Sequence, residues 1–322
     1  MPTLRDFLEK INIRGQYRLN EPLAPRCSFG IGGPADALVR PRDAASAARL
    51  FAAARSEGIP IFVLGGGANI LVGDGGFRGI VLDMGDLTRI DEAPAVSPAS
   101  ETSGPAGGGI LIAAEAGLSM DLLCMEALCR GLGGLEDFSG MPGSVGGSAY
   151  MNARCYEREM SQVLGWIESA RADGSVVRRA HSPGLWSYKR SPYQCGAGFE
   201  GELILSAAFI LHPGEPSALA ATMRARRADR ETKGHYRLPS AGSVFKNDRS
   251  FGRPTGKILD ELGFRGRRIG AAAVSDWHAN IFVNTGGASA RDMRALIELA
   301  RDETRAKLGL ELEPEVLFVG EF

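Results

Sequence analysis

Apolar and polar positions along the first quarter of the chain predict alternating strands and helices. Residues 34–67 predict a strand, an Ala-rich helix that begins near Asp43 and ends near Gly58, and a second strand that runs into three glycines. A further strand is expected within 69–84. The Pro/Ser/Gly-rich stretch 92–109 predicts an exposed loop between strands. This part of the chain therefore indicates an α/β fold.

The middle of the chain continues this pattern. Ser119 is a good N-cap for a helix that Gly131 ends. The pair Asp173-Gly174 is a strong hairpin signal. The apolar run 201–211 is too short to cross a bilayer and predicts one buried strand.

The last third begins with a helix that has a basic face, at 217–234, and we place a domain boundary near residue 215. Helices and short strands then alternate up to a strand-like C-terminal segment. At 322 residues the chain is long enough for about two domains.

Charge and composition exclude several classes of function. A net charge of −1 does not favour nucleic acid or an anionic membrane surface as a partner. The N-terminal 15 residues predict a capped surface helix rather than a targeting segment, so a cytoplasmic protein is expected. Five scattered cysteines and four unpaired histidines predict neither a disulfide framework nor a metal site.

The glycine loop at 65–67 follows a strand and invites comparison with a dinucleotide-binding motif, with Asp83 as the ribose-binding acid. Ile70 stands where the third glycine belongs, and the glycine-rich residues that follow are unsuited to a crossover helix. What remains is a loop whose backbone N–H groups can approach a phosphate closely, with the Asn69 amide beside them.

A second glycine-rich stretch, 140–153, carries no charge over residues 140–152 and is also suited to close backbone approach by a flat or anionic ligand. Two such loops suit a ligand with two phosphates. The alternative is that both are tight turns between strands.

Six segments, taken in order, resemble the UDP-N-acetylenolpyruvoylglucosamine reductase family over nearly the whole chain. They are CSFGIGGPA, LGGGANILVGDGGFRGIVL, GMPGSVGGSAYMNA, AGSVFKN, GKILDELGFRGRRIGAAAVSDWHANIFVN and LEPEV. The resemblance implies an α/β (α+β) chain with a two-part FAD-binding domain of the PCMH type, at 1–84 and 85–215. A smaller α+β substrate-binding domain follows at 216–322, and its C-terminal strand returns to the active site. The short spacing between YKRS and RETK resembles the family's shorter, second type.

The same resemblance implies non-covalent FAD, reduced by NADPH, and reduction of an enolpyruvyl ether on a UDP-sugar to a lactyl ether. Neither a metal nor an obligate protein partner is expected. The residues that it assigns to cofactor binding are Phe29, Gly30, Ile31, Gly65, Gly66, Gly67, Ala68, Asn69, Ile70, Met141, Pro142, Gly143, Ser144 and Gly147.

Two catalytic roles are carried over through AGSVFKN and LEPEV. Ser243 is expected to donate the proton, and Glu315 to share in stabilising the enolate-like intermediate that hydride transfer leaves. Without the resemblance, Ser243 would be a turn residue at the edge of a strand and Glu315 a solvated charge.

The substrate-binding residues implied by the resemblance are Tyr188, Arg190, Arg230, Lys233 and Asn247. The alternative is that Arg230 and Lys233 lie on a solvated face of the helix and that Asn247 is a turn residue.

The chain departs from the family pattern at two positions. Lys189 stands where the catalytic arginine belongs, and lysine lacks the planar fork that binds a carboxylate through two bonds. We expect Lys189 to act as a point charge, with Arg190 as the alternative if the local strand shifts. Arg154 replaces a glycine after the second glycine stretch, and a further hypothesis is that it supplies the missing guanidinium.

Two other functions are weighed against the reductase. A PCMH-type sugar or alcohol oxidase would use oxygen, and many such proteins attach flavin through a histidine, which neither glycine stretch contains. A non-catalytic nucleotide-sugar binder with the same fold is the other alternative. The oxidase does not explain the serine and the glutamate.

Overall fold

The computed structural model describes residues 3–93, 109–194, 196 and 198–322. Most of the predicted loop 92–109, and Cys195, lie outside the described residues. The described chain forms two compact units. The first takes its residues from Met1–Leu19, Ala37–Gly66 and Gly79–Arg227, and the second from Asn20–Asp36, Gly67–Arg78 and Ala228–Phe322. The second unit therefore includes two short N-terminal segments in addition to the expected substrate-binding domain. The boundary between the units lies inside helix α5 (Pro216–Thr232), after Arg227, whereas it was expected near residue 215.

A four-stranded sheet opens the first unit, in the order β1-β2-β5-β3. Its strands and the flanking helices are α1 (Leu4–Ile11), β1 (Gly15–Pro22), β2 (Pro34–Pro41), α2 (Ala44–Ser56), β3 (Ile61–Leu64) and β5 (Phe77–Asp83). Strands β3 and β5 are parallel, and the described residues between them contain the short strand β4 (Ile70–Val72) but no helix. The prediction that a crossover helix is missing is confirmed, although two strands occupy 69–84 where one was expected.

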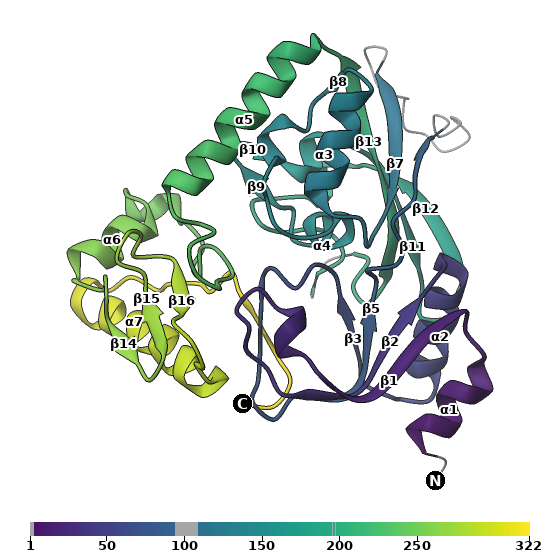
Figure 1. Ribbon diagram of the computed structural model, residues 1–322, viewed down its shortest axis with the longest axis horizontal. Coiled ribbons are helices and arrows are strands. Elements are labelled where there is room, and N and C mark those ends of the chain that lie inside the picture. The colour runs from purple at the N-terminus through teal and green to yellow at the C-terminus, as the bar shows by residue number, and fades with distance from the viewer. Residues whose placement is uncertain (1–2, 94–108, 195, 197) are drawn as a thin grey trace. The chain divides into compact units, whose positions relative to one another are not determined.

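A second, larger sheet completes this unit, with its main path in the order β12-β11-β13-β7-β6. Figure 1 labels β7, β11, β12 and β13 of this sheet. Its elements are β6 (Ile90–Glu92), β7 (Ile110–Glu115), α3 (Met120–Cys129), β8 (Leu132–Gly133), α4 (Val145–Tyr150), β11 (Leu164–Ala170), β12 (Val176–Ala180) and β13 (Leu203–Pro213). Helices α2 and α4 both pack on β13, which is the buried strand predicted from 201–211.

Local sequence signals explain where these elements begin and end. The Asp43 side chain accepts a 2.7 Å hydrogen bond from the Ser46 N–H and so caps α2, as predicted. Gly174, at φ 84°, closes the turn between β11 and β12, which confirms the expected hairpin. Ser119 lies at the start of α3, but its side chain makes no capping bond.

The second unit has its own core and a small antiparallel sheet, β14 (Arg268–Ile269), β15 (Ala272–Val274) and β16 (Phe282–Asn284). Helix α7 (Ala290–Leu308) packs on β14, β15 and α6 (Thr255–Glu261). Its buried residues follow helical spacing, and Ser289 and Asp292 form a reciprocal cap at its start. Strand β17 (Leu317–Val319) pairs in parallel with β4.

Five short 3-10 helices complete the described chain: Ala24–Arg26, Glu136–Phe138, Met160–Gln162, Pro183–Leu185 and Arg249–Phe251. Within the part of the chain that the structure describes, the helices are too short or too polar to cross a membrane.

Candidate active site

The two glycine-rich loops meet within the first unit. A Cβ atom on Gly65 would lie 2.4 Å from the Ser144 Oγ, and one on Gly66 would lie 2.6 Å from the Gly143 Cα. A Cβ on Gly66 would meet backbone, and one on Gly65 would displace the Ser144 hydroxyl, so glycine at both positions allows the two loops to approach closely. The predicted phosphate loops are therefore one structural feature rather than two separate turns.

Backbone donors gather where these loops meet. Among the residues that the structure describes, the N–H groups of Gly65, Gly66, Gly143 and Ser144 donate no hydrogen bond within the protein. Clustered backbone N–H groups without protein acceptors form a concavity that binds anions. The donor set fits the diphosphate of a dinucleotide cofactor.

The second glycine stretch turns into helix α4 after Ser144. The Ser144 Oγ caps this helix by accepting a 3.3 Å bond from the Gly147 N–H, so Gly147 is helical rather than part of an open loop. Met141 is buried, whereas Pro142 is exposed at the rim of the stretch.

The other predicted cofactor residues belong to the second unit. The Gly67 carbonyl accepts a 3.0 Å bond from the Ser28 N–H, which joins the loop that contains Phe29, Gly30 and Ile31 to the end of the glycine loop. Gly67 adopts φ 62°, and a Cβ there would lie 2.0 Å from the Arg26 carbonyl oxygen.

Three predicted cofactor residues of this unit have side chains in its core. Phe29, Ile31 and Ile70 are 0%, 3% and 7% exposed. Their contribution to a ligand is therefore restricted to the backbone, and the Phe29 carbonyl already accepts a 3.0 Å bond from the Asn284 amide. Ala68, between Gly67 and Asn69, is half-buried.

Ser243 follows a turn and lies in an extended segment. Gly242 adopts φ 72°, a conformation that favours glycine, and Ser243 then pairs with Ile281 in an antiparallel bridge. The turn is therefore made by Gly242, and Ser243, which is half-buried, comes directly after it.

The segment that carries Ser243 also pairs with the one that carries Glu315. The Glu315 N–H donates a 2.7 Å bond to the Val244 carbonyl, and Phe245 bridges Pro314. The structure thus pairs, within one unit, the segments of the two residues expected to be catalytic, although these are far apart in the chain.

Asn280 was not identified from the sequence, yet it contacts this segment at three points. Its Oδ1 accepts a 3.0 Å bond from the Phe245 N–H, and its Nδ2 donates a 2.8 Å bond to the Phe245 carbonyl. Its own carbonyl accepts a 2.8 Å bond from the Val244 N–H. Asn280 is 1% exposed, so these bonds are shielded from water.

His278 fixes Asn280 in turn. The Asn280 N–H donates a 3.2 Å bond to the His278 Nδ1, which requires that this nitrogen carry no proton. Burial lowers the pKa of His278, so the ring is neutral at pH 7, in agreement with this bond.

The Asn69 side chain makes a hydrogen bond within the protein. Its Nδ2 donates a 2.9 Å bond to the Glu315 carbonyl. Together with the N–H bond to Val244, this interaction holds the Glu315 backbone on both sides. The glycine loop and the C-terminal glutamate are therefore joined directly.

The predicted strand around Lys189 is a turn. Ser187 and Arg190 pair in a bridge, and Tyr188 and Lys189 lie between them, with Lys189 at φ 57°. The argument from strand geometry, that neighbouring side chains face opposite sides, therefore does not apply to the choice between Lys189 and Arg190. Lys189 is half-buried and Arg190 is exposed.

Arg154 lies beside this turn, in the first unit. Its guanidinium carbon is 5.4 Å from the centre of the Tyr188 ring, and it forms an ion pair with Glu157. Arg154 belongs to β9 (Arg154–Cys155), which pairs with β10 (Arg158–Glu159) across a turn in which Tyr156 and Glu157 both have positive φ.

Asn152 and Ser191 tie the Tyr188 turn to the second glycine stretch. Asn152 is 0% exposed and donates a 2.8 Å bond from Nδ2 to the Ser187 carbonyl. The Ser191 Oγ donates a 2.6 Å bond to the Tyr150 carbonyl. These two hydrogen bonds hold both sides of the turn that carries Lys189.

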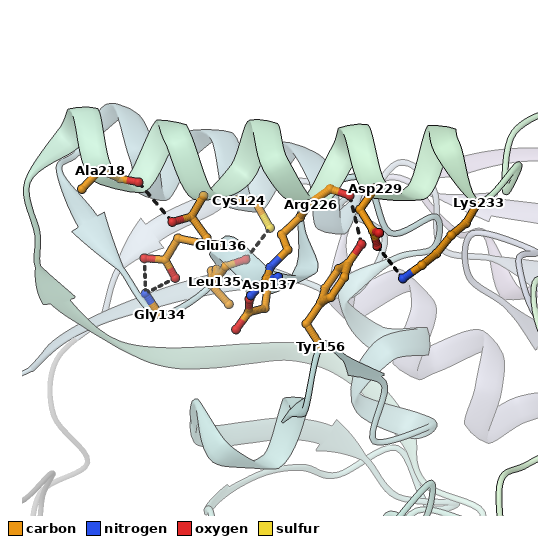
Figure 2. Close-up of polar contacts among 11 residues, drawn as sticks. Cys124, Gly134, Leu135, Glu136, Asp137, Tyr156, Ala218, Arg226, Asp229 and Lys233 are labelled. Carbon is orange, nitrogen blue, oxygen red and sulfur yellow. Dashed lines mark hydrogen bonds and ion pairs between the residues drawn. The ribbon is translucent and has the colours of Figure 1, made fainter. Parts of the chain in front are cut away.

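The basic residues predicted to bind substrate lie at and after the end of α5. Lys233 forms a 2.7 Å ion pair with Asp229 one helical turn earlier (Figure 2), and Arg230 is half-buried beside it. In the same view the Tyr156 hydroxyl donates a 3.0 Å bond to the Arg226 carbonyl, so the β9–β10 hairpin supports this helix.

Asn247 is exposed and has a local structural role. Its Oδ1 accepts a 2.9 Å bond from the Thr255 N–H at the start of α6. This observation favours a turn and capping role, and leaves the amide nitrogen for any ligand.

Asp83 has no role in a dinucleotide site. It is 5% exposed, lies 3.5 Å from the Arg40 guanidinium and accepts a 2.9 Å bond from the Gly85 N–H. Among the described residues, no three histidine, cysteine or acidic side chains are grouped closely enough to hold a metal ion.

Family models match both parts of the chain. The model of an FAD binding domain matches residues 35–179, and that of the UDP-N-acetylenolpyruvoylglucosamine reductase C-terminal domain matches residues 234–319.

Relatives match over nearly the whole length. The chain is 38% identical to the UDP-N-acetylenolpyruvoylglucosamine reductase of Treponema denticola, over 96% of this chain and 95% of that protein. It is 40% identical to the reductase of the same name from Rubrobacter xylanophilus, over 94% and 95%. The crystal structure of the enzyme from Thermus caldophilus superimposes with a TM-score of 0.73 at 29% identity, and covers 95% of this chain and 99% of that one.

Proposed function

The chain belongs to the UDP-N-acetylenolpyruvoylglucosamine reductase family, and from this premise we propose that it reduces UDP-N-acetylglucosamine enolpyruvate to UDP-N-acetylmuramate with Ser243 as proton donor. The observation that carries the proposal is the pairing of the Ser243 segment with the Glu315 segment through the 2.7 Å bond between the Glu315 N–H and the Val244 carbonyl. The reaction would serve peptidoglycan precursor synthesis in the cytoplasm.

The chain is an oxidoreductase that uses FAD, with NADPH as the reductant. FAD, when bound, takes hydride from NADPH and passes it to the substrate. The N–H groups of Gly65, Gly66, Gly143 and Ser144 would hold its diphosphate, because they lie together and make no hydrogen bond within the described protein.

Ser243 and Glu315 would act on the charge that hydride addition creates. Hydride at the methylene carbon of the enolpyruvyl group leaves an enolate-like anion, and a proton must then reach the adjacent carbon. Ser243 would supply this proton, and a positioned general acid typically contributes about 10²- to 10⁴-fold. Glu315, protonated or hydrogen-bonded to the substrate carboxylate, would stabilise the anion, since a bare carboxylate would repel it.

Lys189 would provide the positive charge that the family places on arginine. Its position in a turn held by Asn152 and Ser191 favours a fixed cation. Tyr188 would contact the substrate beside it, and Arg154, stacked on the Tyr188 ring, adds a second cation to the same region. Arg190 remains the alternative, and Arg230, Lys233 and Asn247 would bind the diphosphate of the UDP-sugar.

A single-turnover experiment tests this function. The purified protein should be yellow, NADPH should bleach its flavin spectrum, and UDP-N-acetylglucosamine enolpyruvate should restore the spectrum with formation of UDP-N-acetylmuramate. If air reoxidised the flavin rapidly, at a rate that did not depend on the UDP-sugar, the protein would be an oxidase instead. A colourless protein that binds the UDP-sugar without turnover would identify a binding protein.

A further inference from the structure

The Asn280 side chain takes the place of a strand neighbour for one residue of the Ser243 segment, Phe245, on the edge that does not pair with the Glu315 segment. A backbone in an extended segment normally satisfies its N–H and carbonyl groups by pairing with an adjacent strand. Phe245 instead places both of these groups against one side-chain amide, at 3.0 Å for the N–H bond and 2.8 Å for the carbonyl bond.

The position of Glu315 depends on the same residue. The Asn280 carbonyl accepts the Val244 N–H at 2.8 Å, and the Val244 carbonyl accepts the Glu315 N–H at 2.7 Å. Val244 thus links Asn280 on one side to Glu315 on the other. A shift of Asn280 would move the serine and the glutamate relative to each other.

Because the surroundings are buried, position 280 requires a side-chain amide. Asn280 is 1% exposed, and Val244 and Phe245 are 0% and 1% exposed, so water cannot substitute for a lost partner. A carboxylate at this position would keep the acceptor for the Phe245 N–H but would place a second oxygen against the Phe245 carbonyl. The fold therefore requires one donor and one acceptor on the same planar group.

We propose that Asn280 is a positioning residue that sets the Ser243 hydroxyl and the Glu315 carboxyl for the proton-transfer step. The proposal rests on the proposed function, because it assumes that Ser243 is the acid. It predicts a selective effect: the half-reaction with NADPH needs no proton from Ser243, whereas the half-reaction with the UDP-sugar does.

The test compares Asn280→Asp with Ser243→Ala and with Leu296→Ala, a buried position in α7 of the same unit whose truncation lowers stability but leaves the Asn280 amide in place. Flavin reduction by NADPH and reoxidation by UDP-N-acetylglucosamine enolpyruvate are followed separately by stopped flow. In Asn280→Asp, reoxidation should slow by about 10- to 100-fold, the scale expected when a reacting group is misplaced by about 1 Å, and its solvent deuterium isotope effect should rise. Reduction by NADPH should stay within about twofold of the unchanged protein.

Amide hydrogen exchange gives a readout that does not depend on activity. Exchange over residues 243–247 should speed up in Asn280→Asp, and should not do so selectively in Leu296→Ala. Asn280→Ala, which removes the amide without adding charge, serves the same comparisons if the aspartate variant does not fold.

Two results would overturn the inference. If Ser243→Ala slows reoxidation while the Asn280 variants do not, or if these variants slow both half-reactions in the proportion seen for Leu296→Ala, Asn280 has no positioning role. If Ser243→Ala leaves reoxidation unchanged, the proposed function of the serine fails and the role of Asn280 fails with it.

Discussion

The Glu315 N–H donates a 2.7 Å hydrogen bond to the carbonyl oxygen of Val244, the residue that follows Ser243. This bond connects the C-terminal segment to the segment that begins at the left-handed Gly242. The Asn69 amide holds the carbonyl of the same glutamate at 2.9 Å. The segment of the proposed proton donor and the residue that carries the carboxyl group are therefore held by bonds to backbone atoms, which do not involve the side chains of Ser243 and Glu315.

Replacement of Ser243 by alanine should remove the proton donor without altering the fold. We expect reoxidation of the reduced flavin by the UDP-sugar to slow by about 10²- to 10⁴-fold, with reduction by NADPH unchanged. Stopped-flow absorbance measures both steps. Ser250→Ala, at an exposed serine of the same unit, is the matched control and should leave both rates unchanged.

Glu315 and Glu313 provide a pair of acidic residues for comparison. Glu315→Gln should lower kcat by about 10²- to 10³-fold, the range seen when one group that stabilises a developing charge is removed. Glu313 lies 2.7 Å from Lys246 on a side chain that is 58% exposed, and Glu313→Gln should change kcat by less than about threefold. Equal effects in steady-state assays of the two variants would contradict the assigned role of Glu315.

The contact between the glycine loops predicts a steric effect on cofactor binding. In Gly66→Ala the new methyl group would lie 2.6 Å from the Gly143 Cα, so the loops must separate. We expect the dissociation constant for FAD to rise by about tenfold or more, equivalent to a loss of about 1.4 kcal/mol. Gly184→Ala, where no atom lies within 4 Å, is the control. Fluorescence titration of the apoprotein with FAD would disprove the shared site if both variants bound equally.

Arg154 and Lys189 can be separated by mutation. A hydrogen bond to a charged group contributes about 1.5–3 kcal/mol, so if Arg154 binds the substrate carboxylate, Arg154→Ala should lower kcat/KM for the UDP-sugar by about 10- to 150-fold. Glu157→Gln removes only the exposed ionic partner of Arg154 and should have a smaller effect. If Arg154→Ala had unchanged turnover while Lys189→Ala abolished it, the hypothesis that Arg154 supplies the missing guanidinium would be wrong.

The lowered pKa of His235 leads to a prediction of how the free energy of unfolding depends on pH. Burial, followed by the charges of Arg230, His278 and Lys233, lowers the pKa of His235 to about 4 from 6.5. Between pH 6.5 and 4, His235 is therefore protonated in the unfolded chain but neutral in the folded protein. The free energy of unfolding should fall as the pH decreases from 6.5 towards 4. Allowing for partial solvent exposure, the loss is about 1–2 kcal/mol.

Chemical unfolding at several pH values measures this loss. His235→Gln should reduce the slope between pH 6.5 and 4, and the remaining slope should include His278, whose pKa is also lowered by burial. A slope that is identical in the variant would show that His235 does not titrate in this range.

Much of the fold was predictable because its signals are local. The Asp43 cap of α2, the hairpin at Gly174 and the buried strand β13 depend on residues close in the chain. The missing crossover helix after the first glycine loop was predicted for the same reason, since each glycine in a helix interior is unfavourable relative to alanine. Ser243 and Glu315 were identified through motifs, and the chain alone gave no measure of their proximity.

The tertiary structure decided the partners of polar groups that lie far apart in the chain. Asn69 donates to the Glu315 carbonyl, Asn280 pairs with Phe245, and Lys189 lies in a turn instead of a strand. Local patterns determine which backbone conformations are favourable, because propensity, capping and turn chemistry act over a few residues. Which buried amide satisfies which distant backbone group depends on how the whole unit packs, since every such group must find a partner once water is excluded.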